Sequence, residues 1–241
     1  MNAEKLSKRL ERVATYVPNG ATVADIGSDH AYLPCYLVKQ GVVKKAIAGE
    51  VVEGPFQSAV NQVKELGLES HISVRKGDGL EVVAPGEVDC ITIAGMGGTL
   101  IANILERGKN KLSSVKRLVL QPNIGAPTLR KWLYDHCWEI IAEEILEEEG
   151  KIYEIIVAEK GDPSRPYNEL EKELLLGPFL IHQQNGAFRK KWEMELKEFE
   201  RILSQLSKAT PNERVNKKRS ELEKKIAYVK EVLNDENPER S

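Results

Sequence analysis

The stretch VADIGSDHAYLP, residues 23–34, decides the fold of this chain. An apolar run over residues 23–26 stops at Gly27, as a buried strand stops at a tight turn. A second apolar run, residues 46–48, lies further along and is followed by the acid Glu50. A strand, a glycine turn, a helix and a second strand that ends in a carboxylate form a βαβ unit, which can bind a nucleoside. The Glu50 carboxylate can then accept hydrogen bonds from both ribose hydroxyls.

The residues of the turn distinguish between two nucleoside cofactors. A dinucleotide site uses G-x-G-x-x-G to place a pyrophosphate on the helix N-terminus. Here the turn reads GSDHA, residues 27–31, with one glycine and with Asp29 where a phosphate would approach. A carboxylate repels a diphosphate in a low-dielectric site, whereas it attracts the sulfonium and ammonium groups of S-adenosylmethionine. Asp25 and Asp29 therefore indicate S-adenosylmethionine as the cofactor.

The composition predicts a cytoplasmic enzyme. The 241 residues suffice for one core domain with an appendage. No apolar run approaches the roughly 20 residues of a membrane span, and the charged N-terminus lacks the apolar centre of a signal peptide. Cys35, Cys90 and Cys137 form no C-x-x-C pair. Neither a metal site nor a disulfide framework is therefore indicated, and a reducing compartment fits.

Apolar runs and helical spacings alternate along the first two-thirds of the chain. An amphipathic helix opens it, followed by further strands at 72–74, 88–93 and 118–120 and helices at 55–66, 99–107 and 126–137. Two more β-rich runs, 138–145 and 152–158, flank the acidic turn EEEG and predict a hairpin. This order predicts an α/β fold with a Rossmann-like class I methyltransferase core, whose mostly parallel seven-stranded sheet has one antiparallel strand.

The composition changes at the turn-rich segment GDPSRP, residues 161–166. We expect a core domain over 1–162 and a helical domain over 163–241. Within the second domain, Trp192, Leu196, Phe199, Leu203 and Leu206 alternate spacings of four and three, which is typical of a coiled-coil seam. A break at TPN, residues 210–212, and a second seam from 215 to 233 predict an antiparallel helical hairpin.

The helical segment carries more positive charge than the rest of the chain. Residues 186–241 hold 14 Lys and Arg against 11 Asp and Glu, whereas the remainder holds 21 against 26. Helical hairpins with a basic side can bind a folded RNA through its phosphates. By charge alone, however, a solvated coiled-coil surface is the better interpretation.

Three more motifs lie at the ends of expected strands. KGDGL, residues 76–80, offers the Asp78 carboxylate to an adenine amino group, although an Asp-Gly turn is commoner when met alone. AGMGG, residues 94–98, lies where this fold places a methyl donor against its acceptor. QPN, residues 121–123, brings two amides to the same edge, where ligands of open α/β sheets bind. Each motif is weak singly, but four at successive strand ends support one another.

These residues resemble one particular family. VADIGSDHAYLP, AIAGEVVEGPFQSA, GDGL, ITIAGMGG, LVLQPN and ILEEEGKIYEIIVAEKG are similar to segments of the bacterial tRNA (adenine-N1)-methyltransferases that modify adenine 22. The similarity covers nearly the whole core in order, and the helical appendage also fits this family. Asp29 and Ala31 depart from the general methyltransferase G-x-G-x-G, and the family shares that departure. No Asn-Pro-Pro-aromatic tetrad follows the fourth strand, which argues against N6-adenine methylation.

The resemblance implies a donor site for S-adenosylmethionine and tRNA as the substrate. We predict no obligatory protein partner. Its donor-binding residues would be Asp25, Gly27 and Ser28 in the first turn, Glu50 at the ribose, Asp78 and Gly79 at the adenine, and Ala94, Gly95 and Met96 beside the methionine.

Catalysis needs no general base, because adenine N1 already has a free lone pair. Asp29 is the candidate that stabilises positive charge on the product base, although a helix N-cap is an equal interpretation. His30 and Asn123 are candidate contacts to the base. Tyr32 is either a stacking platform or, more simply, a packed aromatic residue.

Two other functions remain open at this point. One is a methyltransferase for another RNA, a protein or a small molecule, in which the coiled coil serves dimerisation. The other is a non-catalytic RNA-binding or scaffold protein that uses the fold alone. Calorimetry with S-adenosylmethionine and assays with tRNA or a metabolite panel distinguish them.

Overall fold

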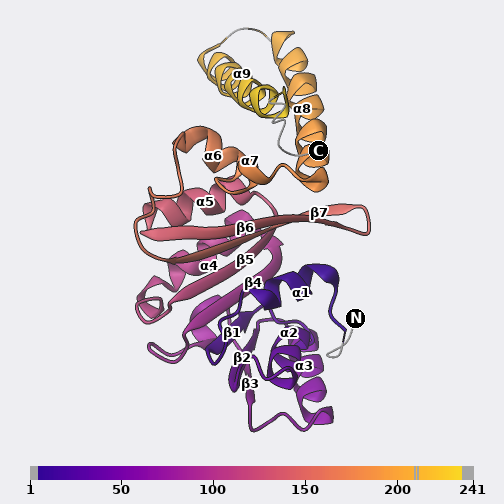
Figure 1. The fold of residues 1–241 in the computed structure, drawn as a ribbon, viewed down its shortest axis with the longest axis vertical. Coiled ribbons are helices and arrows are strands. Elements are labelled where there is room, and N and C mark those ends of the chain that lie inside the picture. The colour runs from indigo at the N-terminus through magenta and orange to yellow at the C-terminus, as the bar shows by residue number, and fades with distance from the viewer. Residues whose placement is uncertain (1–4, 209, 211, 235–241) are drawn as a thin grey trace.

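A computed structural model describes residues 5–208, 210 and 212–234. A seven-stranded sheet with strand order β3-β2-β1-β4-β5-β7-β6 forms its centre (Figure 1). The strands are β1 (Thr22–Ile26), β2 (Lys45–Glu50), β3 (Ile72–Lys76), β4 (Cys90–Gly97), β5 (Arg117–Ile124), β6 (Trp138–Glu148) and β7 (Lys151–Lys160). All neighbouring pairs up to β5 are parallel, and β7 is antiparallel to both β5 and β6. The predicted α/β class and the single antiparallel strand are confirmed.

Helices cover both faces of the sheet. One face packs against α1 (Lys8–Thr15), α2 (Tyr32–Lys39) and α3 (Glu53–Glu65), and the other against α4 (Gly98–Arg107) and α5 (Ala126–Asp135). The short 3-10 turns η1 (Gly79–Val82) and η2 (Lys109–Lys111) complete the core. Because both faces are covered, the central strand β1 is buried over four successive residues instead of alternating.

The ends of β4 and β5 differ from the sequence prediction. The segment AGMG, expected to follow its strand, belongs to β4, because the pairing continues through Ala94↔Gln121 and Met96↔Pro122. QPN, expected to end its strand, lies in the last residues of β5, which runs one residue further. The register shifts on both sides of Met96, and Gly95 has φ +82°, which favours glycine. Such an irregular strand end tolerates Pro122, which lacks a backbone N–H. The effect is to extend two strands into the expected binding edge.

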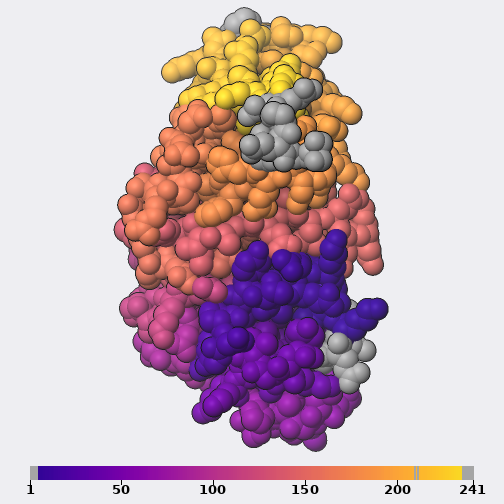
Figure 2. Space-filling model, in the orientation of Figure 1, coloured from indigo at the N-terminus to yellow at the C-terminus, as the bar shows by residue number. Residues whose placement is uncertain are grey.

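The chain beyond β7 is helical over the described residues. It forms α6 (Leu170–Leu176), α7 (Leu180–Gln183), α8 (Gly186–Ser207) and α9 (Glu213–Asn234). The last two pack as an antiparallel hairpin, since Arg189 donates to the Leu233 carbonyl and Lys230 pairs with Glu200. Figure 1 shows this hairpin rising from the β6–β7 side of the sheet. The space-filling view shows the hairpin continuous with the rest of the molecule (Figure 2).

A buried group of charges connects the hairpin to the sheet. Arg130, fully buried on α5, donates to Glu143 of β6 at 2.6 Å and to Glu154 of β7, and Glu154 also pairs with Lys191 of α8. We call these four residues the Arg130 cluster. The Glu143 carboxylate also accepts from the Phe179 amide at 3.0 Å. Ion pairs and hydrogen bonds thus fix α6–α8 against the core.

Candidate active site

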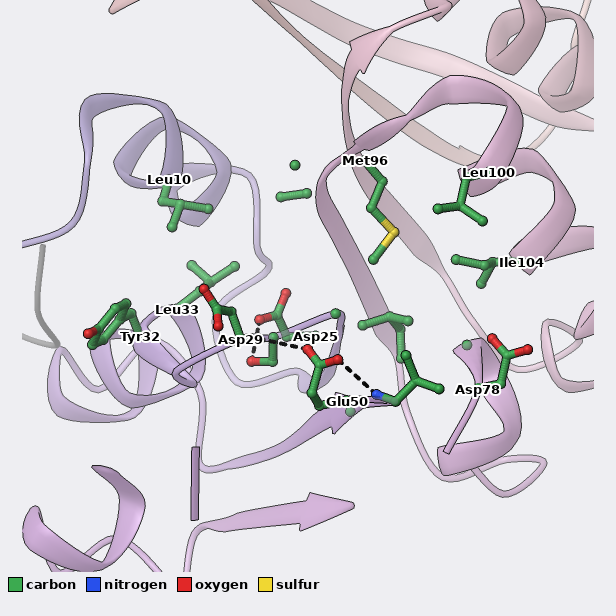
Figure 3. Close-up of a pocket in the computed structure, with 18 of the residues that line it drawn as sticks. Leu10, Asp25, Asp29, Tyr32, Leu33, Glu50, Asp78, Met96, Leu100 and Ile104 are labelled. Atoms are coloured by element: carbon green, nitrogen blue, oxygen red, sulfur yellow. Dashed lines mark hydrogen bonds between the residues drawn. The ribbon is translucent and has the colours of Figure 1, made fainter. Parts of the chain in front are cut away.

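A pocket of about 450 Å³ opens at the carboxyl ends of β1 to β4. Figure 3 shows Asp25, Asp29 and Glu50 together on one side of it, and Met96, Leu100 and Ile104 on the other, with Asp78 near Ile104. The sequence-predicted residues that line it are Asp25, Gly27, Ser28, Asp29, Glu50, Asp78, Gly79, Ala94, Gly95 and Met96. His30 and Asn123 are outside this lining set. The topology therefore brings all nine expected donor-binding residues, together with Asp29, to one cavity.

Glu50 is the last residue of β2 and is almost fully buried. Its Oε1 accepts from the amides of Val51 and Val52 at 2.8 and 3.0 Å, and its Oε2 accepts from the Asp29 amide at 3.2 Å. Among the described residues it makes no ion pair. The carboxylate is thus held in place by backbone donors and keeps acceptor capacity toward the pocket.

Asp25 lies at the bottom of the pocket and is 5 % exposed. Its two carboxylate oxygens accept from the hydroxyls of Ser28 and Thr92, both at 2.6 Å. Burial raises the pKa of Asp25, although the two hydroxyl bonds partly oppose this. Asp25 and Ser28 are therefore bonded to each other, and they fix the shape of the first turn.

The first turn has an unusual backbone. Gly27, Asp29 and Ala31 have φ values of +71°, +52° and +54°, in the left-handed region. A Cβ built on Gly27 would lie 2.1 Å from the Met96 Cε, the flexible end of that side chain, so the positive φ and not the space is the reason for glycine. Left-handed backbone at non-glycine residues is costly, and it concentrates at functional sites.

Asp29 is not the N-cap of α2. That position belongs to Ala31, and no side chain caps this helix, so the capping interpretation of Asp29 was wrong. The Asp29 side chain is 62 % exposed at the pocket, and its Oδ1 lies 3.6 Å from the His30 Nε2. His30 in turn stacks on Tyr32, with ring centroids 5.1 Å apart. Tyr32 lines the pocket and packs against the core, as the packed-aromatic interpretation expects, and its role as a stacking platform stays a prediction.

Asp78 begins η1 at the other end of the pocket. Its carboxylate accepts from the Arg107 guanidinium at 2.6 and 3.3 Å, and both side chains are about half exposed. An adenine amino group at this position would share the carboxylate with Arg107. No sequence pattern indicates this ion pair, because Arg107 comes from the following helix α4.

The amides of QPN lie in a hydrogen-bonded ring at the β4–β5 edge. Buried Gln121 accepts from the Gly95 amide at 2.9 Å and donates to the Asn123 Oδ1 at 3.1 Å. Asn123 then donates to the Gly95 carbonyl at 2.8 Å. Both amides thereby hold the backbone of Gly95, which lines the pocket. Asn123 is therefore placed to position the edge of the pocket.

Arg9 is a pocket residue that the sequence analysis missed. It comes from α1, donates to the Gln121 Oε1 and lies over the Tyr153 ring at 5.2 Å. Burial lowers its pKa, although nearby acidic groups partly oppose this. Among the described lining residues it is the one base, against the acids Asp25, Asp29, Glu50 and Asp78. No spacing pattern signalled it, because α1 precedes the βαβ unit and reaches this edge only in the folded chain.

This combination suits a ligand with several cationic groups and one anionic group. The buried thiols offer no alternative nucleophile, because burial raises the pKa of Cys35 to about 11 and of Cys90 to about 12. Across the described part of the chain, none of the helices has both the length and the apolar content to cross a membrane.

Comparisons with known proteins agree with this geometry. The profile of the family described as "TrmK: tRNA (adenine(22)-N(1))-methyltransferase" matches residues 23–231. The Bacillus subtilis tRNA (adenine(22)-N(1))-methyltransferase is 54 % identical over 235 residues, which are 97 % of this chain and 99 % of the relative. Its crystal structure superposes with a TM-score of 0.93 at 54 % identity, covering 96 % of this chain and 100 % of the other.

Two further structures hold ligands of the expected class. A Streptococcus pneumoniae protein in complex with S-adenosyl-L-methionine has a TM-score of 0.84 and 47 % identity, covering 95 % of this chain and 100 % of the other. M. capricolum TrmK with S-adenosyl-homocysteine has a TM-score of 0.80 and 30 % identity, covering 95 % and 98 %. The resemblance inferred from sequence motifs is confirmed: this chain belongs to the TrmK family of tRNA (adenine(22)-N1)-methyltransferases.

Proposed function

We propose that this protein transfers a methyl group from S-adenosylmethionine to N1 of adenine 22 in bacterial tRNA, in the cytoplasm. The observation that carries the proposal is the Glu50 carboxylate, buried at the end of β2 without a cationic partner among the described residues. Backbone donors compensate this burial only in part, and a cationic or hydroxyl-bearing ligand would complete it. Family membership supports the same reaction.

The pocket residues fit this cofactor group by group. Glu50 would accept from the ribose hydroxyls, and Asp78 with Gly79 would bind the adenine. Ala94, Gly95 and Met96 would lie along the methionine, and the cation of Arg9 would pair with its carboxylate. Asp25, Gly27 and Ser28 would shape the turn beneath them. Bound S-adenosylmethionine supplies an electrophilic methyl group on a cationic sulfur.

The protein's catalytic contribution is orientation and electrostatics. Adenine N1 needs no deprotonation, so no residue has to act as a base, and positioning supplies most of the rate. The exposed carboxylate of Asp29 stabilises the positive charge that develops on the methylated purine. His30, beside Asp29, and Asn123, at the β5 edge, contact the base.

The second proposed domain, residues 163–241, binds the tRNA. The boundary after residue 162 lies between β7 and α6. Of the basic clusters in this domain, Lys190 and Lys191 are neutralised by Glu147 and Glu154. The sequence from the end of α8 into the first turns of α9 differs: residues 208–219 contain five Lys or Arg and one Glu. We call this segment the hairpin tip and assign it the phosphate contacts, which need charge but no sequence readout.

A single assay tests the reaction. The enzyme is incubated with S-adenosylmethionine and an unmodified tRNA transcript, and primer extension maps the product, because N1-methyladenine blocks Watson–Crick pairing. A transcript with guanine at position 22 is the control. We expect a stop at position 22 in the first transcript and none in the second.

The same assay discriminates the alternatives. A methylated product that is independent of adenine 22 would point to another substrate. Failure to bind S-adenosylmethionine in calorimetry would leave a non-catalytic RNA-binding protein.

A further inference from the structure

Large apolar side chains that remain exposed are concentrated near one edge of the sheet. In the described structure they are Val51, Val52, Leu100, Ile124 and Met194, each about half exposed or more. Val51 and Leu100 line the donor pocket, and Val52 follows directly. Ile124 and Met194 line a different cavity. Grouped exposed apolar residues mark binding surfaces, whereas scattered ones need no explanation.

The second cavity has a volume of about 320 Å³. It lies between the end of β5, the β6–β7 turn and the first half of α8, which Figure 1 shows standing over that end of the sheet. Its apolar lining includes Ile124, Ile152 and Met194, and Lys151 and Glu195 add polar groups. Lys151 is exposed and makes no ion pair with any described residue. The volume is at the lower end of the range for small-molecule sites, about 300–1,000 Å³.

The two cavities meet at one hydrogen bond. Asn123, which lines the second cavity, donates at 2.8 Å to the carbonyl of Gly95, which lines the donor pocket. Ile124 likewise lies close to Gly97 at the end of β4. The second cavity therefore adjoins the donor pocket and is available to the next unit of a polymer whose target group enters that pocket.

We propose that the second cavity binds an unpaired nucleobase adjacent to the target adenine in the same RNA. The inference rests on the proposed function and extends it. An enzyme that acts on a base inside a folded RNA must unstack it, which exposes one face of the adjacent base. Ile124 and Met194 provide an apolar surface for that base, and Lys151 provides charge for its phosphate. We expect the cavity to accept any of the four bases, because an apolar surface contacts the face of a base and not the hydrogen-bonding groups at its edge.

A double-mutant cycle that combines protein variants with RNA variants tests this proposal. Met194→Ala and Ile124→Ala are assayed on intact tRNA and on tRNA with an abasic nucleotide on the 5′ or the 3′ side of adenine 22. On intact tRNA we expect kcat/KM to fall about 10-fold, the size of one lost base contact, with unchanged affinity for S-adenosylmethionine. On the RNA abasic at the recognised side, the protein variants should cause no further loss. Gln205→Ala, an exposed neutral residue further along α8, is the matched control and should have no effect.

The outcomes separate this inference from the proposed function. A wild-type enzyme that leaves adenine 22 unmodified overturns both. An active wild-type enzyme whose Met194 and Ile124 variants lose the same factor on intact and abasic RNAs overturns the nucleobase assignment alone, as does the absence of any loss. Such a result would point to a bound protein or small molecule, or to a purely structural surface.

Discussion

Two groups of buried carboxylates lie at opposite halves of the same sheet, and their hydrogen-bond and ion-pair partners differ. Asp25 and Glu50, at the β1–β2 side, accept only from hydroxyls and backbone amides among the described residues. Glu143 and Glu154, at the β6–β7 side, share the guanidinium of Arg130. All four are less than a tenth exposed. The two groups are therefore similarly buried and differ only in the residues that they bind.

The difference indicates two purposes. Charges neutralised within the chain hold its elements together, because the attraction is satisfied in the folded state. Carboxylates that accept only from neutral donors keep a negative charge that no cation in the described part of the chain neutralises by an ion pair. The first group therefore suits a cationic cofactor. Removing a residue from the Arg130 cluster should cost stability, and removing one from the pocket should cost binding or catalysis.

The largest expected effect is on stability. Arg130→Ala leaves Glu143 and Glu154 buried without their shared cation, and we expect the free energy of unfolding to fall by about 3–5 kcal/mol. Urea denaturation followed by circular dichroism measures it. Arg201→Ala is the control, since the exposed Arg201–Glu198 pair should contribute little. An Arg130 variant as stable as the wild type would show that the carboxylates of the Arg130 cluster do not serve stability, in contrast to our interpretation.

Glu50→Ala should mainly weaken binding of S-adenosylmethionine. Loss of two charge-assisted hydrogen bonds to the ribose should cost roughly 2–4 kcal/mol of affinity, which calorimetry detects as a weaker Kd. Glu53→Gln, an exposed acid paired with Lys76 just beyond the pocket, is the control. An unchanged Kd for the Glu50 variant would refute the ribose assignment.

Asp29→Ala should act on turnover more than on cofactor binding. Its carboxylate is proposed to stabilise charge that appears only during methyl transfer, so kcat should fall about 10- to 100-fold at saturating tRNA. The affinity for S-adenosylmethionine should stay within about a factor of two. Single-turnover kinetics and calorimetry together measure the split. Normal turnover would leave Asp29 a structural residue of the turn.

The hairpin tip should carry the salt dependence of tRNA binding. Replacing Arg214, Lys217 and Lys218 together with Gln should reduce the slope of log affinity against log salt by about 2–3. Lys224→Gln is the matched control, because this lysine is already paired with Glu171. Filter binding at several salt concentrations measures the slopes. If both proteins keep the wild-type slope, the phosphate contacts lie elsewhere.

The smallest expected effect is a pH dependence within the Arg130 cluster. Burial raises the pKa of Glu154, but Lys191 and Arg130 lower it more, to about 2 from an ordinary 4.5. A depressed pKa gives stability that is present above 4.5 and lost as the pH falls toward 2. The net effect is small, because burial raises the pKa of Glu143 and so opposes it.

Glu154→Gln isolates that contribution. The difference in unfolding free energy between wild type and variant should shrink as the pH falls from about 4.5 to about 2. Chemical denaturation at several pH values checks it. A difference that stays constant over this range would show that Glu154 is not ionised in the folded protein.

The sequence by itself determined the core and most of the pocket. Strand, turn and helix are local patterns, and parallel strands bring their carboxyl ends to one edge. Glu50, Asp25 and Gly95 were found in this way, as residues at strand ends. Motifs in the same order at those ends also indicate the family from the sequence alone.

Only the tertiary structure decided which distant residues meet. Arg9 joins Gln121 across 112 residues, and Arg130 joins Leu175 across 45. Periodicity reports whether a residue is buried but not against which partner, so neither contact left a signal in the sequence. The same holds for Ile124 and Met194. Their shared cavity exists because the packing of the helical segment on the sheet places α8 against the end of β5. Local patterns therefore fixed where the donor binds, and long-range packing decided how the charges around it are paired.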